Sequence, residues 1–148
     1  MSQAEIKEIL IKYKVIAVVG ASDKIGKPSH RVAAYLKNHG FCIIPVNPFI
    51  DEVFGLKSYK SLLDIPEETQ RTIDVVDVFR RAENVPPVVE QAIKLKQMVG
   101  RPFVVWMQLG IVNEQAAEAA QKAGLVVVMD KCMMAEHQRL REEEAQLK

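Results

Sequence analysis

The chain has 148 residues with 20 lysine and arginine against 19 aspartate and glutamate side chains, so its formal net charge is only +1. That length fits a single domain, expected over residues 1–148, and the near-neutral charge gives no general attraction to nucleic acid or a membrane surface. No apolar run approaches the about 20 residues of a membrane span, and the two cysteines form neither a disulfide framework nor a metal-ligand cluster, so we expect a cytoplasmic protein.

The predicted elements alternate between helices and apolar strands. A helix over 4–13 comes first, and the strands are expected at 15–19, 41–46, 73–79, 103–107 and 125–129. Strands that are apolar on both faces are typical of a parallel sheet covered by helices. Between the second and third strands, 47–72 is expected to form a loop with one short helix. The pattern predicts an α/β fold, an open and doubly wound parallel sheet of five strands in the order 3-2-1-4-5, with helices on both faces.

A glycine turn follows the first strand and is the most informative local feature. The strand at 15–19 ends at Gly20, and Ala21 and Ser22 lead towards a helix with Pro28 in its first turn. Backbone N–H groups and the positive end of a helix dipole meet at such a turn, where anions bind. The turn lacks the second glycine of the dinucleotide fingerprint, which indicates a phosphate site unlike that of NAD proteins. An ordinary turn without a ligand is the alternative.

The residues that follow the other strands should border the same crevice, because the carboxyl ends of parallel strands lie at one edge of a sheet. Asn47 stands where NAD proteins carry an acidic residue for the ribose. Asp51, beyond a proline, keeps an NAD-binding alternative open. The basic residues that suit a ligand with several phosphates are Lys24, Lys27, Arg31, Arg80 and Arg81.

The thiol of Cys132 is expected at the start of the last helix beside Lys131, where thiols become reactive, although a buried and inert cysteine is the alternative. Cys42, within an apolar strand, is expected in the core. His30 is a candidate phosphate contact, and Asp130 is expected to cap the last helix. No set of nucleophile, base and orienting residue stands out, so Cys132 is a candidate for redox chemistry only.

Several segments between residues 18 and 137 form a specific set, in the order Val-Val-Gly-Ala-Ser, Ile-Ile-Pro-Val-Asn-Pro, Val-Asp-Val-Phe-Arg-Arg and Val-Trp-Met-Gln-Leu-Gly. With them the chain resembles the small single-domain CoA-binding proteins, relatives of the CoA-binding domain of the succinyl-CoA synthetase alpha subunit. The resemblance implies a Rossmann-like domain, with a diphosphate at the turn after the first strand and the pantetheine arm near the fourth. It implies no ligase activity, because the other parts of the synthetase have no counterpart here.

The predicted function is the binding of coenzyme A or an acyl-CoA without catalysis, as a carrier, sensor or regulatory module, by a monomer or a homodimer whose protein partner is unknown. An NAD(P)-dependent oxidoreductase and a CoA-linked thiol redox protein that uses Cys132 are the alternatives. The expected ligand-binding residues are Gly20, Ala21, Ser22, Lys27, Ser29, His30, Val46, Asn47, Phe79, Arg80, Gln108, Leu109, Gly110 and Lys131.

Overall fold

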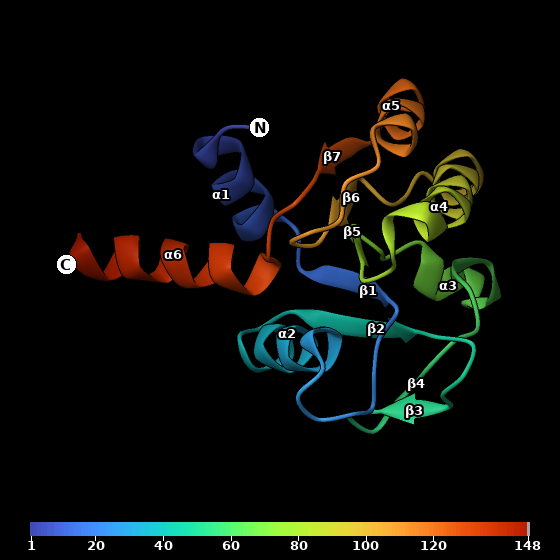
Figure 1. Ribbon diagram of the computed structural model, residues 1–148, viewed down its shortest axis with the longest axis horizontal. Coiled ribbons are helices and arrows are strands. Elements are labelled where there is room, and N and C mark those ends of the chain that lie inside the picture. The colour runs from blue at the N-terminus through green and yellow to red at the C-terminus, as the bar shows by residue number, and fades with distance from the viewer. Residues whose placement is uncertain (148) are drawn as a thin grey trace.

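The computed structural model describes residues 1–147 and is built around a five-stranded parallel sheet (Figure 1). Its strands are β1 (Val15–Val19), β2 (Cys42–Val46), β5 (Val75–Val78), β6 (Val104–Met107) and β7 (Val126–Val128). A small antiparallel hairpin, β3 (Glu52–Val53) and β4 (Leu56–Lys57), follows β2. The five strands expected from the apolar runs are confirmed.

The strand order is β2-β1-β5-β6-β7, so the predicted order 3-2-1-4-5 is wrong. The third expected strand, β5, pairs with β1 and does not lie outside β2. The reason is in the connection after β2, where Tyr59 pairs in parallel with Val46 and so occupies the outer edge of that strand. The amide N–H of Tyr59 donates to Pro45 and its carbonyl accepts from Asn47. The chain then crosses back to the free edge of β1.

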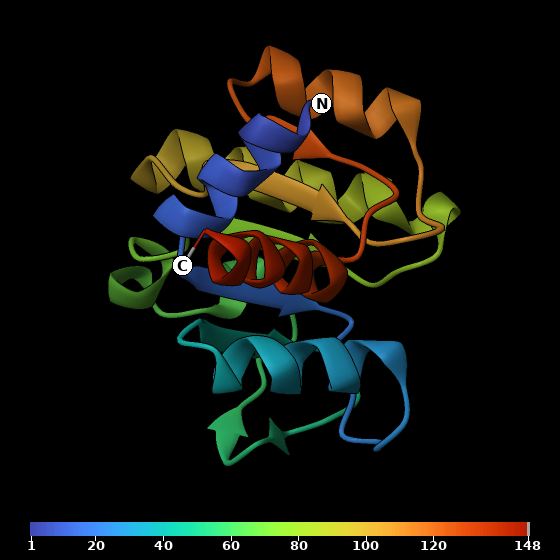
Figure 2. The ribbon, with the colours of Figure 1, turned by 90° about the vertical axis from the view of Figure 1, so that its left-hand side faces the viewer.

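Helices cover both faces of the sheet, as expected for a doubly wound fold (Figure 2). One face is covered by α1 (Gln3–Lys12), α2 (Pro28–Asn38) and α6 (Met133–Gln146). The other face is covered by two long helices, α4 (Val85–Val99) and α5 (Glu114–Lys122). Three short helices lie on the same side: η1 (Leu62–Asp64), α3 (Glu67–Gln70) and η2 (Ala82–Asn84), which directly precedes α4. Within residues 1–147 no helix combines the length and apolar character that a bilayer span requires.

The central strands are buried on both faces because their side chains alternate between the two helical layers. On β1, Val18 belongs to the cluster under α1, α2 and α6, whereas Val19 belongs to the opposite cluster. Asp77 is an exception to the apolar pattern of β5: it lies between Val18 and Trp106 in the sheet and has no exposed surface. This carboxyl group therefore lies inside the protein.

Two local predictions need correction. Asp130 does not cap α6, because its φ of 59° turns the chain before the helix begins, and its Oδ1 accepts the N–H of Gly110 at 2.7 Å. Cys132 takes the N-cap position without a side-chain hydrogen bond. Cys42 is exposed and not in the core, since it occupies the first position of an edge strand, where the sheet ends.

Candidate ligand-binding cavity

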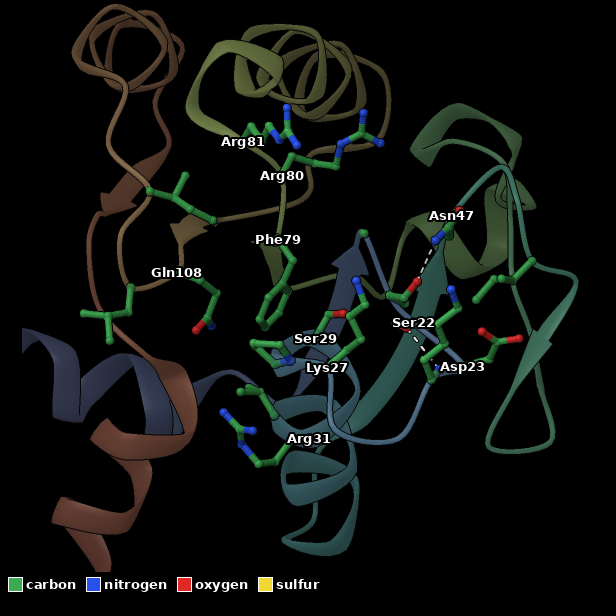
Figure 3. Close-up of a pocket in the computed structure, with 18 of the residues that line it drawn as sticks. Ser22, Asp23, Lys27, Ser29, Arg31, Asn47, Phe79, Arg80, Arg81 and Gln108 are labelled. Atoms are coloured by element: carbon green, nitrogen blue, oxygen red, sulfur yellow. Dashed lines mark hydrogen bonds between the residues drawn. The ribbon is translucent and has the colours of Figure 1, made fainter.

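A cavity of about 940 Å³ opens at the carboxyl ends of β1, β5 and β6, beside the start of α2 (Figure 3). This volume lies in the range of small-molecule and cofactor sites. Helices α2 and α4 leave their strands towards opposite faces of the sheet, which opens a crevice between β1 and β5. In the observed strand order, the chain winds outwards in opposite directions from β1 and β5, and the cavity lies beside this pair of strands.

Gly20 lies at the end of β1, where the backbone comes close to the end of β5. Its N–H donates to the carbonyl of Val46 at 2.9 Å, so it continues the sheet and is not free for a ligand. Its φ is 91°, and a Cβ atom there would lie 2.4 Å from the carbonyl oxygen of Phe79. The close approach of two strand ends therefore requires a glycine at this position.

The turn after Gly20 and the start of α2 supply unused donors. Within residues 1–147, the N–H groups of Ala21, Ser22 and Ser29 have no hydrogen-bond partner. Lys27, the N-cap residue of α2, makes no side-chain capping bond, which leaves the first turn of this 11-residue helix open. Ser29 lines the cavity with only 8% of its surface exposed. Free N–H groups at a helix N-terminus favour an anion, such as a phosphate group.

Asn47 holds two loops together at the edge of the cavity. Its Nδ2 donates to the carbonyl of Ala21 at 2.7 Å, and its Oδ1 accepts the N–H of Phe49 at 2.8 Å. The side-chain amide thus joins the turn after β1 to the loop after β2. Asn47 lines the cavity, and its two contacts hold the turn after β1 in place.

Five basic side chains line the cavity, and none of them forms an ion pair with another residue of 1–147. The single acidic side chain among the described lining residues is Asp23. Figure 3 shows that Lys27 and Arg31 approach from the side of α2, whereas Arg80 and Arg81 approach from the end of β5. Since the whole chain carries a net charge of only +1, this is a local concentration of positive charge.

Most of the predicted ligand-binding residues come together here. The cavity is lined by Gly20, Ala21, Ser22, Lys27, Ser29, Asn47, Phe79, Arg80, Gln108 and Leu109, and also by the redox candidate Cys132. Lys24, Arg31 and Arg81 from the predicted basic set line it too. Residues so far apart in sequence meet because each follows a strand of the same parallel sheet.

Four predicted residues do not line the cavity. The ring of His30 packs against Phe54 with centroids 4.8 Å apart, and Val46 is buried in the core. Gly110 donates its N–H to Asp130, while the carbonyl of Lys131 accepts from Trp106. Strand-end position alone did not reveal which way each residue faces.

The sequence reading missed an apolar part of the lining, formed by Phe49, Ile50 and Ile111. Phe49 is 88% exposed, an unusual position for a large aromatic side chain, and it follows the Asn47 turn. Asp51, the residue that kept the NAD alternative open, is exposed and does not line the cavity. Among residues 1–147, no carboxylate that directly follows a strand lines the cavity, whereas NAD proteins use such a carboxylate for the ribose.

A hydrogen-bonded pair of polar side chains lies near the end of β6, where Gln108 lines the cavity and Asp77 is buried next to it. Gln108, with 3% of its surface exposed, donates from Nε2 to Oδ1 of the buried Asp77 at 2.8 Å. Burial raises the pKa of Asp77 to about 7, and the hydrogen bond from Gln108 opposes this shift only in part. The sequence signal for this residue was an aspartate in the middle of an apolar strand.

The chain matches the family model for the CoA binding domain over residues 14–138. It is 43% identical to an uncharacterized protein of Bacillus subtilis over 136 residues, which are 92% of this chain and 94% of that protein. A hypothetical protein from Pyrococcus horikoshii has a similar structure, with a TM-score of 0.85, 44% identity and coverage of 95% and 92% of the two chains.

The ADP-forming acetate–CoA ligase II of Archaeoglobus fulgidus is 36% identical over 115 residues, which are 76% of this chain and only 17% of the ligase. The similarity thus covers one portion of a much longer enzyme. The resemblance stated from the sequence motifs is confirmed: the chain belongs to the CoA-binding domain family, which also supplies the CoA-binding domain of the ADP-forming acetate–CoA ligases.

Proposed function

We propose that the chain binds coenzyme A, free or as a thioester, in the cavity at the ends of β1, β5 and β6. The observation that carries the proposal is the set of five basic side chains without ion-pair partners around a cavity of about 940 Å³. Coenzyme A carries a diphosphate and a 3′-phosphate on one nucleotide, so it suits several cations on two sides of one cavity.

The proposed orientation follows from the chemistry of the lining. The diphosphate lies at the free N–H groups of Ala21, Ser22 and Ser29, and Phe49 and Ile50 offer an apolar wall to the adenine. The pantetheine arm then extends towards β6 and the start of α6, where Gln108 and Cys132 line the cavity. In this orientation the thiol end of the ligand lies near the protein thiol.

The proposed role is that of a binding module, acting as a carrier or a sensor of CoA, and not that of a ligase. The proposal is supported by the family model that matches residues 14–138, which describes a CoA binding domain. Apart from Cys132, the lining offers basic side chains, free N–H groups and apolar side chains, which suit the binding of phosphates and an aromatic ring.

A second function is favoured by one observation, the place of Cys132 in the cavity lining. The thiolate of Cys132 would attack a CoA disulfide, forming a protein–CoA mixed disulfide and releasing one molecule of CoA as its thiolate. No other oxidant is required, since the CoA disulfide is itself reduced. Cys42 is also exposed, so burial does not protect it from the same reaction, contrary to the expectation from the sequence.

Labelling of the two thiols tests the proposed binding. Bound CoA is expected to slow the labelling of Cys132, because the pantetheine arm covers that part of the cavity, and to leave the exposed Cys42 unchanged as an internal control. Peptide mapping after brief exposure to a thiol reagent, with and without CoA, measures both sites. Equal labelling of Cys132 in the two samples would contradict the proposed orientation, whereas a mixed disulfide formed at Cys132 with CoA disulfide would support the redox function.

A further inference from the structure

Asp77 occupies an unfavourable position for a carboxyl group. It lies in the middle of the central strand β5, with no exposed surface, and its neighbours across the sheet are Val18 and Trp106. Its Oδ2 has no hydrogen-bond partner within the described residues. A buried polar atom without a partner costs free energy, and a valine would continue the apolar pattern of the strand. Stability alone therefore does not account for an aspartate here.

The partner of Asp77 points to another reason. Gln108 directly follows β6 and lines the cavity, and its Nε2 donates a hydrogen bond to Asp77 Oδ1 at 2.8 Å. Above its pKa of about 7, the ionised carboxylate of Asp77 only accepts hydrogen bonds, so it selects the NH₂ end of the glutamine amide. The Oε1 atom of Gln108 accepts no hydrogen bond from residues 1–147, and Figure 3 shows this side chain beside Phe79 in the cavity.

We propose that Asp77 is a positioning residue that fixes the amide of Gln108, so that Oε1 faces the cavity and accepts an amide N–H from the pantetheine arm. The inference rests on the proposed binding of CoA and adds the feature of the ligand that is recognised. The pantetheine arm contains two amide groups, each with one N–H donor, whereas the nucleotide half is held by the cations and the turn after β1. The cavity thus recognises the pantetheine arm and the phosphate groups through different residues.

The orientation of the Gln108 amide decides whether it attracts or repels this donor. Without the carboxylate, the amide can rotate about its last torsion and turn its NH₂ group to the cavity. Two N–H donors then face one another, and the bound arm loses a hydrogen bond. Loss of Asp77 is therefore expected to act through Gln108, although Asp77 itself does not line the cavity.

Isothermal titration of two ligands into four proteins tests the proposal. The proteins are the wild type, Asp77→Val, Gln108→Leu and the double variant, at about pH 8, above the pKa of about 7 that burial gives Asp77. The ligands are CoA and adenosine 3′,5′-bisphosphate, which lacks the pantetheine arm. Each single variant is expected to bind CoA roughly three- to tenfold more weakly, which corresponds to the loss of one neutral hydrogen bond. The double variant is expected to be no weaker than Gln108→Leu, and the bisphosphate should bind all four proteins equally.

Three results would overturn the proposal: unchanged CoA affinity in Asp77→Val, an equal loss for both ligands, or additive losses in the double variant. If Asp77→Val does not fold, Asp77→Asn keeps the shape of the side chain. It is also expected to weaken CoA binding, because an asparagine can donate to Oε1 and turn the amide round. Wild-type protein that fails to bind CoA would overturn the proposed function itself, an outcome distinct from wild-type binding that is insensitive to Asp77.

Discussion

Replacing Gly20 by alanine is expected to lower the free energy of unfolding by more than about 2 kcal/mol, which combines left-handed strain with a backbone collision. The added Cβ would lie 2.4 Å from the carbonyl oxygen of Phe79 and 3.1 Å from its carbon, both backbone atoms of the neighbouring strand end. Chemical denaturation, monitored by circular dichroism, measures the change. The turn would have to open before the chain could accommodate the methyl group.

Gly124 offers a matched control for this substitution. Its φ is 90°, close to the 91° of Gly20, but a Cβ atom there meets nothing within 4 Å. Gly124→Ala is expected to cost only the conformational strain, about 1 kcal/mol. Equal losses in the two variants would show that the approach of β1 to β5 does not require the glycine.

The second large effect is expected at Asp77, where asparagine should raise the free energy of unfolding at about pH 8 by on the order of a few kcal/mol. The pKa of Asp77 in the folded protein is about 7, above its ordinary value of 3.8. The unfolded chain therefore releases this proton first, and the wild type loses stability as the pH rises from about 4 to about 7. Asparagine cannot ionise, so the variant escapes that loss.

Denaturation curves at about pH 4 and about pH 8 check this dependence, since the two proteins should differ little at the lower pH and most at the higher. Asp74→Asn is the matched control on the segment before β5. Asp74 pairs with Arg101 at 2.8 Å and accepts the N–H groups of Lys14 and Val15, so its neutralisation should destabilise the protein. A stability gain from Asp77→Asn that is equally large at both pH values would contradict the assigned ionisation.

The apolar runs predicted the strands because burial on both faces leaves a local signal in the sequence. Strand order has no such signal. It depends on the pairing of Tyr59 with the outer edge of β2, a contact made inside the segment 47–72, for which the sequence predicts only a loop with a short helix. A single backbone pairing thus changed the neighbour of β1 and, with it, the two strands between which the crevice opens.

The candidate site was predictable to the extent that it follows from strand ends. Gly20, Phe79 and Gln108 meet because parallel strands end at one edge, whereas His30 turns away to pack on Phe54. The direction of a side chain on a helix or loop depends on tertiary neighbours that one sequence does not display. The same holds for Asp77, whose contact with Gln108 joins residues 31 positions apart.

Isothermal titration of the wild-type protein with CoA, 3′-dephospho-CoA and NAD tests the proposed function most directly. CoA is expected to bind most tightly for two reasons. The basic side chains of the cavity can bind a third phosphate group, and Asn47 offers no carboxylate to a free ribose. Loss of the 3′-phosphate removes at least one charge-assisted hydrogen bond, worth about 1.5 to 3 kcal/mol, so 3′-dephospho-CoA should bind roughly tenfold or more weakly. NAD that binds as tightly as CoA would contradict the account and favour the oxidoreductase alternative.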